Sequence, residues 1–109
     1  MEETLKAIEN DVKAHAVLLY MKGSPDFPQC GFSSFVCAVL QKLGVSFEAR
    51  NVLEDNTLRQ GIKAFSNWPT IPQLYVNGQF IGGCDIVKNM YESGELSALF
   101  KKAAPESQK

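Results

Sequence analysis

The sequence has few of the residues that build metal sites and disulfide frameworks. It contains three cysteines and one histidine, and they are widely separated along the chain. A zinc or iron–sulfur site held by one chain needs about four such ligands, commonly at close spacing. A self-sufficient four-cysteine site is therefore excluded. An odd number of cysteines with no secretory signal also argues against a disulfide scaffold, so we expect a reducing compartment.

Other absences narrow the classes of partner. No apolar run approaches the roughly 18 residues of a membrane-spanning helix. The acidic first residues lack the features of a signal or transit peptide. The formal net charge is −1, whereas a nucleic-acid-binding domain needs a basic patch. We therefore expect neither a membrane nor a nucleic acid as partner.

The residues that are present predict one α/β domain over residues 1–109, with its core over about residues 3–102 and a tail over residues 103–109. Of the 109 residues, 45% are hydrophobic and 21% charged, which is ordinary for a globular domain. Apolar residues at helical spacing predict helices over residues 2–14, 32–43, 56–66 and 84–91, and a last helical piece reaching about residue 102. Apolar runs predict strands over residues 16–21, 46–52, 73–76 and 79–81.

These elements follow one another as a parallel half and then an antiparallel half. The helix between the first two strands predicts a right-handed crossover and a parallel pair. Asn77-Gly78 predicts a type I′ turn between the last two strands. Asn56 is expected to cap the helix over residues 56–66. The fold class is thus a four-stranded mixed sheet flanked by about five helices.

Residues 22–33 carry the clearest chemistry. A turn-rich loop with two prolines delivers Cys30 to the start of a helix. The partial positive charge of a helix N-terminus favours the thiolate and lowers a cysteine pKa from about 8.5. Ser33 stands where a redox Cys-x-x-Cys pair has its second cysteine. Cys30 therefore cannot close a local disulfide, and it must react with, or bind, something from outside.

The other two cysteines have less definite interpretations. Cys37 lies about 10 Å further along the same helix, which is too far for a disulfide with Cys30 unless the helix unwinds. We interpret Cys37 as a small packed residue. Cys84 begins a helix after Gly82-Gly83, and the sequence alone fits a packed residue and a second functional thiol equally well.

Three motifs stand at characteristic separations: Cys30-Gly31-Phe32-Ser33, Trp68-Pro69-Thr70-Ile71-Pro72 and Gly82-Gly83-Cys84-Asp85. Together with the order of elements, they resemble the monothiol glutaredoxins of the CGFS class, which have the thioredoxin fold. The resemblance covers about residues 3–102. It implies glutathione as a cofactor and a [2Fe–2S] cluster shared between two chains. The metal ligands would then be Cys30 of each chain and the thiols of two glutathione molecules.

The resemblance also implies partners and a location. It predicts a homodimer with the cluster and a monomer without it, and work in iron–sulfur cluster assembly and iron homeostasis. Apo iron–sulfur proteins would accept the cluster, and a BolA-like protein is a further possible partner. The location would be the cytoplasm for a bacterial protein, or the mitochondrial matrix for a processed eukaryotic one.

The same resemblance gives roles to further residues. Lys22 and Arg59 would bind the glycine carboxylate of glutathione, with a charge-assisted contact of about 1.5–3 kcal/mol. Ile71, before a cis-proline, would pair its main chain with the peptide as an added strand. Cys84 and Asp85 would hold the γ-glutamyl end at a helix start.

Without the resemblance, these charged residues are ordinary surface groups or caps, and the Ile71–Pro72 bond is expected to be trans. The role of Lys63, one turn after Arg59, stays open. Trp68 is either a core aromatic or part of a partner-facing surface, and we favour structural support of the Ile71 loop.

Two functions from different classes use Cys30. The first is glutathione-dependent binding and transfer of a [2Fe–2S] cluster. The alternative is a monothiol thiol–disulfide oxidoreductase that removes glutathione from proteins, an activity that would be weak here. The insertion over residues 24–28 favours the first function, as does Phe32 in place of the tyrosine usual in efficient reductases. A non-redox adaptor would not explain the glutathione-binding residues.

Overall fold

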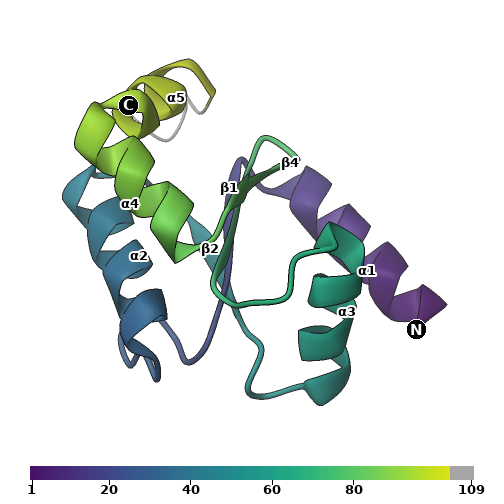
Figure 1. Ribbon diagram of the computed structural model, residues 1–109. Coiled ribbons are helices and arrows are strands. Elements are labelled where there is room, and N and C mark those ends of the chain that lie inside the picture. Colours follow the sequence, from purple (N-terminus) through teal and green to yellow (C-terminus); the bar gives the residue numbers. More distant parts are fainter. Residues whose placement is uncertain (104–109) are drawn as a thin grey trace.

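The computed structural model describes residues 1–103 and contains five helices and four strands in a layered arrangement (Figure 1). In chain order they are α1 Glu2–Ala14, β1 Val17–Met21, α2 Gly31–Lys42, β2 Glu48–Asn51, α3 Asn56–Ser66, β3 Gln73–Val76, β4 Gln79–Gly82, α4 Cys84–Ser93 and α5 Glu95–Ala103. None of the helices in this part of the chain is long and apolar enough to cross a membrane.

The four strands form one mixed sheet in the order β2-β1-β3-β4. β1 and β2 are parallel, β3 is antiparallel to β1, and β4 is antiparallel to β3 with a bulge between Leu74 and Tyr75. Helices α1 and α3 lie on one side of the sheet, and α2, α4 and α5 lie on the other (Figure 1). The predicted fold class is confirmed.

Strand β1 is the centre of the core because every one of its side chains is buried. Successive side chains of a strand point to opposite faces. Val17, Leu19 and Met21 accordingly join the cluster beneath α2, α4 and α5. Leu18 and Tyr20 join the cluster beneath α1 and α3. A strand that is apolar at every position is what a central strand covered on both faces requires.

The hairpin and the parallel pair are confirmed, and several boundaries shift. Asn77 and Gly78 have φ values of 50° and 82°, as a type I′ turn demands. β2 is shorter than the predicted strand, covering Glu48–Asn51 at the edge of the sheet. α4 continues to Ser93 and α5 includes Ala103, which we predicted in the tail. The rest of the predicted tail, residues 104–109, lies outside the described residues.

The predicted cap of α3 is wrong by one residue. Asp55, not Asn56, is the N-cap, and its carboxylate accepts the backbone N–H groups of Thr57 and Leu58. Both residue types are good caps. Asp55 takes the role because its backbone is extended, while Asn56 already belongs to the helix.

The loops after β1 and β2 leave from the same end of the sheet, since these strands are parallel. Asn51, the last residue of β2, joins the two loops. Its Oδ1 accepts the backbone N–H of Gly23 at 2.9 Å and that of Leu53 at 3.0 Å. The loop that carries Cys30 is therefore fixed to the end of the sheet.

Candidate functional site

The segment before Cys30 is a small hairpin-like loop. The N–H of Gln29 donates to the carbonyl of Lys22 at 2.9 Å, and Ser24 and Phe27 exchange two backbone hydrogen bonds of 3.2 and 3.1 Å. Gly23, at φ 91°, makes the turn into the loop. This returning path brings the chain back beside Lys22 and places Cys30 as the N-cap residue of α2.

The cap position explains the electrostatics of Cys30. The backbone N–H of Ser33 is the largest cause that lowers the pKa of the Cys30 thiol, and the N–H of Phe32, the ammonium of Lys22 and the Ser33 hydroxyl act in the same direction. Partial burial raises the pKa, but the net shift is downward. The pKa of the Cys30 thiol is thus lowered, which is the direction predicted for a cysteine at a helix N-terminus.

Ser33 is fully buried, and its Oγ accepts the backbone N–H of Lys22 at 3.1 Å. The residue that replaces a resolving cysteine therefore joins the start of α2 to the end of β1. It holds both the loop and Cys30 in place.

The remaining cysteines both resist ionisation. Cys37 is buried, with its Sγ 3.5 Å from the sulfur of Met21, and burial raises its pKa. Its interpretation as a packed residue is confirmed. Cys84 is half-buried. Burial, and then the negative charges of Asp85 and Cys30, raise the pKa of its thiol.

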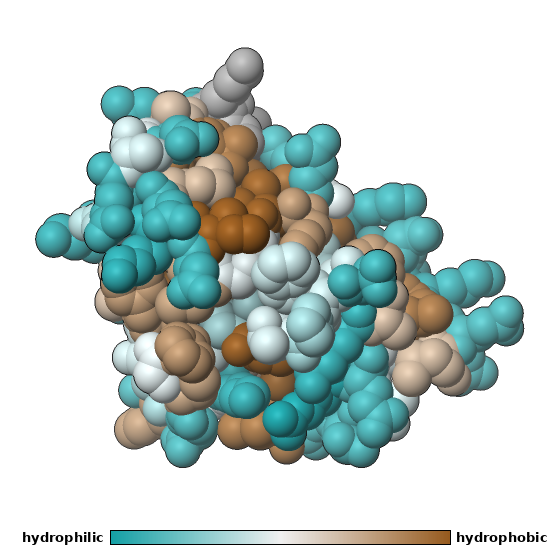
Figure 2. Space-filling view, in the orientation of Figure 1, coloured by the Kyte–Doolittle hydropathy of each residue, from teal (hydrophilic) through white to brown (hydrophobic). Residues whose placement is uncertain are grey.

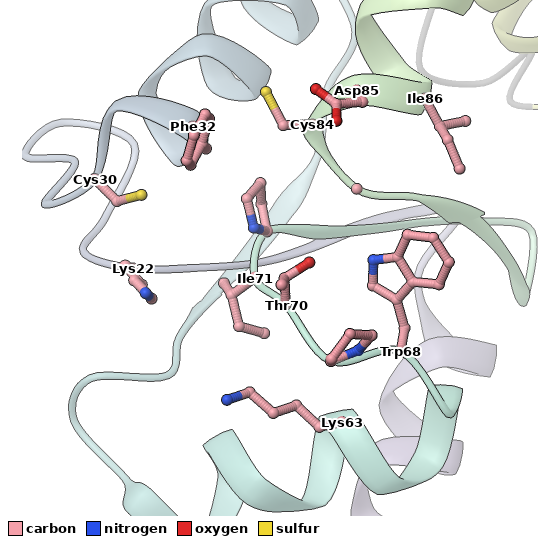
Figure 3. A pocket seen from close by; sticks show the side chains of 13 residues that line it. Lys22, Cys30, Phe32, Lys63, Trp68, Thr70, Ile71, Cys84, Asp85 and Ile86 are labelled. Carbon is pink, nitrogen blue, oxygen red and sulfur yellow. The ribbon is translucent and has the colours of Figure 1, made fainter.

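A pocket of about 420 Å³ joins these elements (Figure 3). It lies between the start of α2, the loop before β3 and the start of α4, with two lysines nearby. The lining residues are Lys22, Cys30, Phe32, Lys63, Trp68, Pro69, Thr70, Ile71, Pro72, Gly83, Cys84, Asp85 and Ile86. In a space-filling view of the molecule, hydrophilic side chains crowd the left and right margins, with more apolar and neutral surface between them (Figure 2).

The structure brings together five of the six predicted site residues: Lys22, Cys30, Ile71, Cys84 and Asp85. Arg59 does not line the pocket. Lys63, four residues later on α3, does. Positions four apart lie on the same face of a helix, so the spacing was consistent with either residue and only the placement of α3 distinguishes them.

Comparisons with known proteins identify the family of this chain. The glutaredoxin family model matches residues 17–81. The chain belongs to the glutaredoxin family. It is 54% identical over 99 residues to a probable monothiol glutaredoxin 2 of Rickettsia typhi, covering 91% of this chain and 89% of the relative. It is 56% identical over 104 residues to the mitochondrial monothiol glutaredoxin-5 of Lachancea kluyveri, covering 93% and 73%.

A solved structure supports the same assignment. The solution structure of reduced apo GrxS14 from poplar has 50% sequence identity to this glutaredoxin and a TM-score of 0.78, with 89% of each chain covered. With its monothiol relatives and the single cysteine of its Cys30-Gly31-Phe32-Ser33 motif, the chain is a monothiol glutaredoxin on the thioredoxin fold.

The loop before β3 forms one wall of the pocket of this glutaredoxin. The Ile71–Pro72 bond is cis, as the resemblance implies. Trp68 packs against Phe80 with ring centroids 5.7 Å apart. A Cβ at Gly83 would come within 3.3 Å of the indole Nε1. These contacts fit the interpretation of Trp68 as structural support, although it also lines the pocket.

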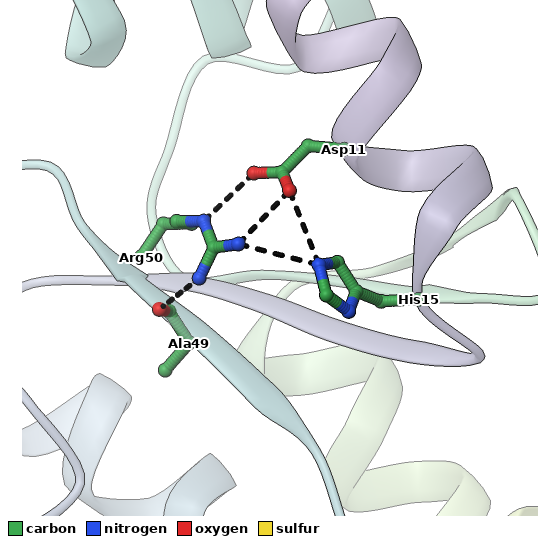
Figure 4. Close-up of polar contacts among 4 residues, drawn as sticks. All are labelled: Asp11, His15, Ala49 and Arg50. Atoms are coloured by element: carbon green, nitrogen blue, oxygen red, sulfur yellow. Dashed lines mark hydrogen bonds and ion pairs between the residues drawn. The ribbon is translucent and has the colours of Figure 1, made fainter.

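The single histidine belongs to a different cluster (Figure 4). His15 follows α1, with its Nε2 3.3 Å from Asp11 Oδ1. Arg50 of β2 donates to both oxygens of Asp11, at 2.7 and 2.9 Å. This cluster joins α1 to the edge strand. Within residues 1–103, no three His, Cys, Asp or Glu side chains gather as metal ligands.

Proposed function

We propose that this monothiol glutaredoxin binds a [2Fe–2S] cluster together with glutathione and transfers the cluster to apo iron–sulfur proteins. The observation that carries the proposal is a single thiolate-favouring cysteine, Cys30, at a pocket whose other cysteine, Cys84, favours the neutral thiol. One chain therefore offers one good metal ligand.

The ligand count determines the assembly. Four thiolates hold a [2Fe–2S] cluster. Two chains supply two through Cys30, and two bound glutathione molecules supply the others. We therefore propose a homodimer that exists only with the cluster, and a monomeric apo protein. Because the glutathione thiols are held non-covalently by the protein, free glutathione stabilises the dimer by mass action.

The pocket fits a small anionic peptide. In the close-up, Lys63 lies below Ile71 and Lys22 lies to its left, whereas Cys84 and Asp85 lie above it (Figure 3). An extended peptide laid across Ile71 would meet ammonium groups at one end. At its other end it would meet the N-terminus of α4, where backbone N–H groups favour a carboxylate. We assign the glycine carboxylate to Lys22 and Lys63 rather than to Arg59, and the γ-glutamyl end to Cys84 and Asp85.

The second candidate is a thiol–disulfide oxidoreductase that removes glutathione from proteins. It is favoured by the same thiolate, since Cys30 can attack the glutathione sulfur of a protein–glutathione disulfide, which breaks the S–S bond and releases the protein thiol. The mixed disulfide left on Cys30 would then be reduced by free glutathione.

For either function, we propose the cytoplasm of a bacterium or the mitochondrial matrix as the location. The relatives include bacterial and mitochondrial proteins.

Anaerobic reconstitution with iron, sulfide and glutathione tests the proposal. The wild type should acquire the visible absorption of a [2Fe–2S] cluster, with about one cluster per two chains. Cys30→Ser should lose it, because a hydroxyl is a poor iron ligand although it keeps the shape of the side chain. Cys37→Ser is the matched control and should retain the cluster, as should Cys84→Ser.

Two results would contradict the proposal. One is loss of the cluster in Cys84→Ser that is as complete as in Cys30→Ser. The other is a colourless wild type with high turnover in a glutathione-coupled disulfide assay, which would select the oxidoreductase.

A further inference from the structure

The wall of the pocket is held by a buried residue that does not itself line it. Gln73, the first residue of β3, is fully buried. Its Nε2 donates to the carbonyl oxygens of Trp68 and Thr70, each at 3.2 Å. Its Oε1 accepts the hydroxyl of Tyr75 at 3.1 Å. The orientation of the amide is settled by these partners, since a flipped amide would set its oxygen against two carbonyl oxygens.

Side-chain packing of Trp68 and Ile71 holds this loop, but backbone pairing does not. Within the described chain, residues 69–71 make no backbone-to-backbone hydrogen bond. Pro69 and Pro72 have no N–H to donate. The side-chain amide of Gln73 therefore replaces the backbone pairing that a strand or helix would supply.

The pinned carbonyl of Thr70 determines where the next N–H points. In a trans peptide unit, the C=O of one residue and the N–H of the next lie in one plane and point in opposite directions. The Thr70 carbonyl points at Gln73, so the N–H of Ile71 points away from Gln73. Thr70 and Ile71 line the pocket and Gln73 does not. The N–H of Ile71 is thus directed to the pocket side of the loop.

We infer that Gln73 is a positioning residue for the peptide ligand: it presents the Ile71 N–H to the pocket by pinning the carbonyls of Trp68 and Thr70 behind it. The inference rests on the proposed function, in which glutathione lies along Ile71. Gln73 touches no ligand and acts only through the loop. The Tyr75 hydroxyl meets only the oxygen of the amide, and the two donors that hold the loop do not depend on it.

Gln73→Met tests the inference because methionine keeps the length and volume of the side chain and removes the two donors. Titration calorimetry with glutathione should show a Kd about tenfold higher than that of the wild type, the order expected when one well-directed hydrogen bond is lost. The matched control is Tyr75→Phe, which removes only the hydroxyl behind the amide. Its Kd should stay within about twofold of the wild-type value.

The double variant Gln73→Met/Tyr75→Phe separates positioning from stability. It removes the Tyr75 hydroxyl, which loses its Gln73 acceptor in the single methionine variant, so its unfolding midpoint should be no lower than that of Gln73→Met. Its affinity for glutathione should stay as low as that of Gln73→Met. Recovery of affinity together with stability would overturn the inference, because it would show that the amide only fills the core. A wild-type Kd in Gln73→Met, or an equal loss in Tyr75→Phe, would overturn it as well.

A measurement on the apo protein keeps this test separate from the proposed function. The carbonyl ¹³C resonances of Trp68 and Thr70 and the amide resonance of Ile71 should shift in Gln73→Met and stay nearly unchanged in Tyr75→Phe. If the wild type bound no glutathione, the proposed function would fail, and these resonances would still decide whether Gln73 pins the loop. Unchanged Thr70 and Ile71 resonances in Gln73→Met would refute the pinning.

Discussion

Two glycines close to Cys30 should respond in opposite ways to the same substitution. Gly23 begins the loop that leads to Cys30, and Gly31 follows Cys30 in the motif. A Cβ at Gly23 would lie 2.5 Å from the backbone oxygen of Phe27 and 2.6 Å from the backbone nitrogen of Gln29. A Cβ at Gly31 would meet nothing within 4 Å. Gly31→Ala is therefore a matched control for Gly23→Ala.

The expected cost of Gly23→Ala has two parts. A side chain at φ 91° costs about 1–3 kcal/mol because L residues rarely adopt that conformation. Overpacking against atoms that cannot rotate away adds about 1–3 kcal/mol, since both close neighbours belong to the backbone. The sum of about 2–6 kcal/mol is a large share of the 5–15 kcal/mol that typically stabilises a domain. Gly31→Ala should instead be neutral or stabilising by up to about 1 kcal/mol, because alanine is the better helix residue.

Equilibrium unfolding in urea measures both variants. Far-UV circular dichroism reports the whole fold, and the fluorescence of Trp68, the only tryptophan, reports the wall of the pocket. The midpoint for Gly23→Ala should fall by about 1–3 M with the slope, about 2 kcal/mol/M, unchanged. Equal destabilisation by the two substitutions would refute the steric argument, as would a Gly23→Ala variant as stable as the wild type.

Three further predictions concern the thiols, the lysines and the assembly. Alkylation followed against pH should show Cys30 reacting below the pH range of an ordinary thiol and Cys84 above it, because the first pKa is lowered and the second raised. Lys63→Met should weaken glutathione binding about tenfold, whereas Arg59→Met should change it little. Light scattering should show a monomer without the cluster and a dimer with it, and desalting to remove glutathione should dissociate the dimer; a stable apo dimer would contradict the ligand count.

Most of the fold could be predicted from patterns that depend on nearby residues. The buried strand β1 needs only its continuous apolar run, and the Asn77-Gly78 turn needs only two residues that tolerate positive φ. The ends of β2 were harder to predict from the sequence, because an edge strand stops where its single neighbour stops pairing. That limit depends on β1, and the residues of β2 itself do not reveal it.

The candidate site divides in the same way. Cys30, Ile71, Cys84 and Asp85 were found because each stands in a short motif. The choice of Lys63 over Arg59 depends on how α3 packs against the sheet, and the helical period alone allows both. Gln73 gave no signal, since a polar residue at the start of a strand usually faces solvent. Only the folded loop shows two carbonyl oxygens converging on its amide.

The two pocket cysteines show how finely position controls chemistry at a helix start. The sequence places both Cys30 and Cys84 beside a helix N-terminus, where the dipole favours thiolates. Cys30 is the N-cap of α2, and the N–H groups of Phe32 and Ser33 in the first turn of the helix lower the pKa of its thiol. Cys84 is already the first residue of α4, and Gly83 takes the cap position.

Because of this difference of one residue, no backbone N–H group is among the causes that shift the pKa of Cys84. Burial and the neighbouring charges of Asp85 and Cys30 then dominate, and its pKa rises. A neutral thiol is a poor metal ligand, because the thiolate is the form that binds metals. In the proposed assembly, the glutathione thiol rather than Cys84 therefore completes the cluster beside Cys30. By the same reasoning, the cluster of the proposed assembly would depend on free glutathione even though a second cysteine lines the pocket.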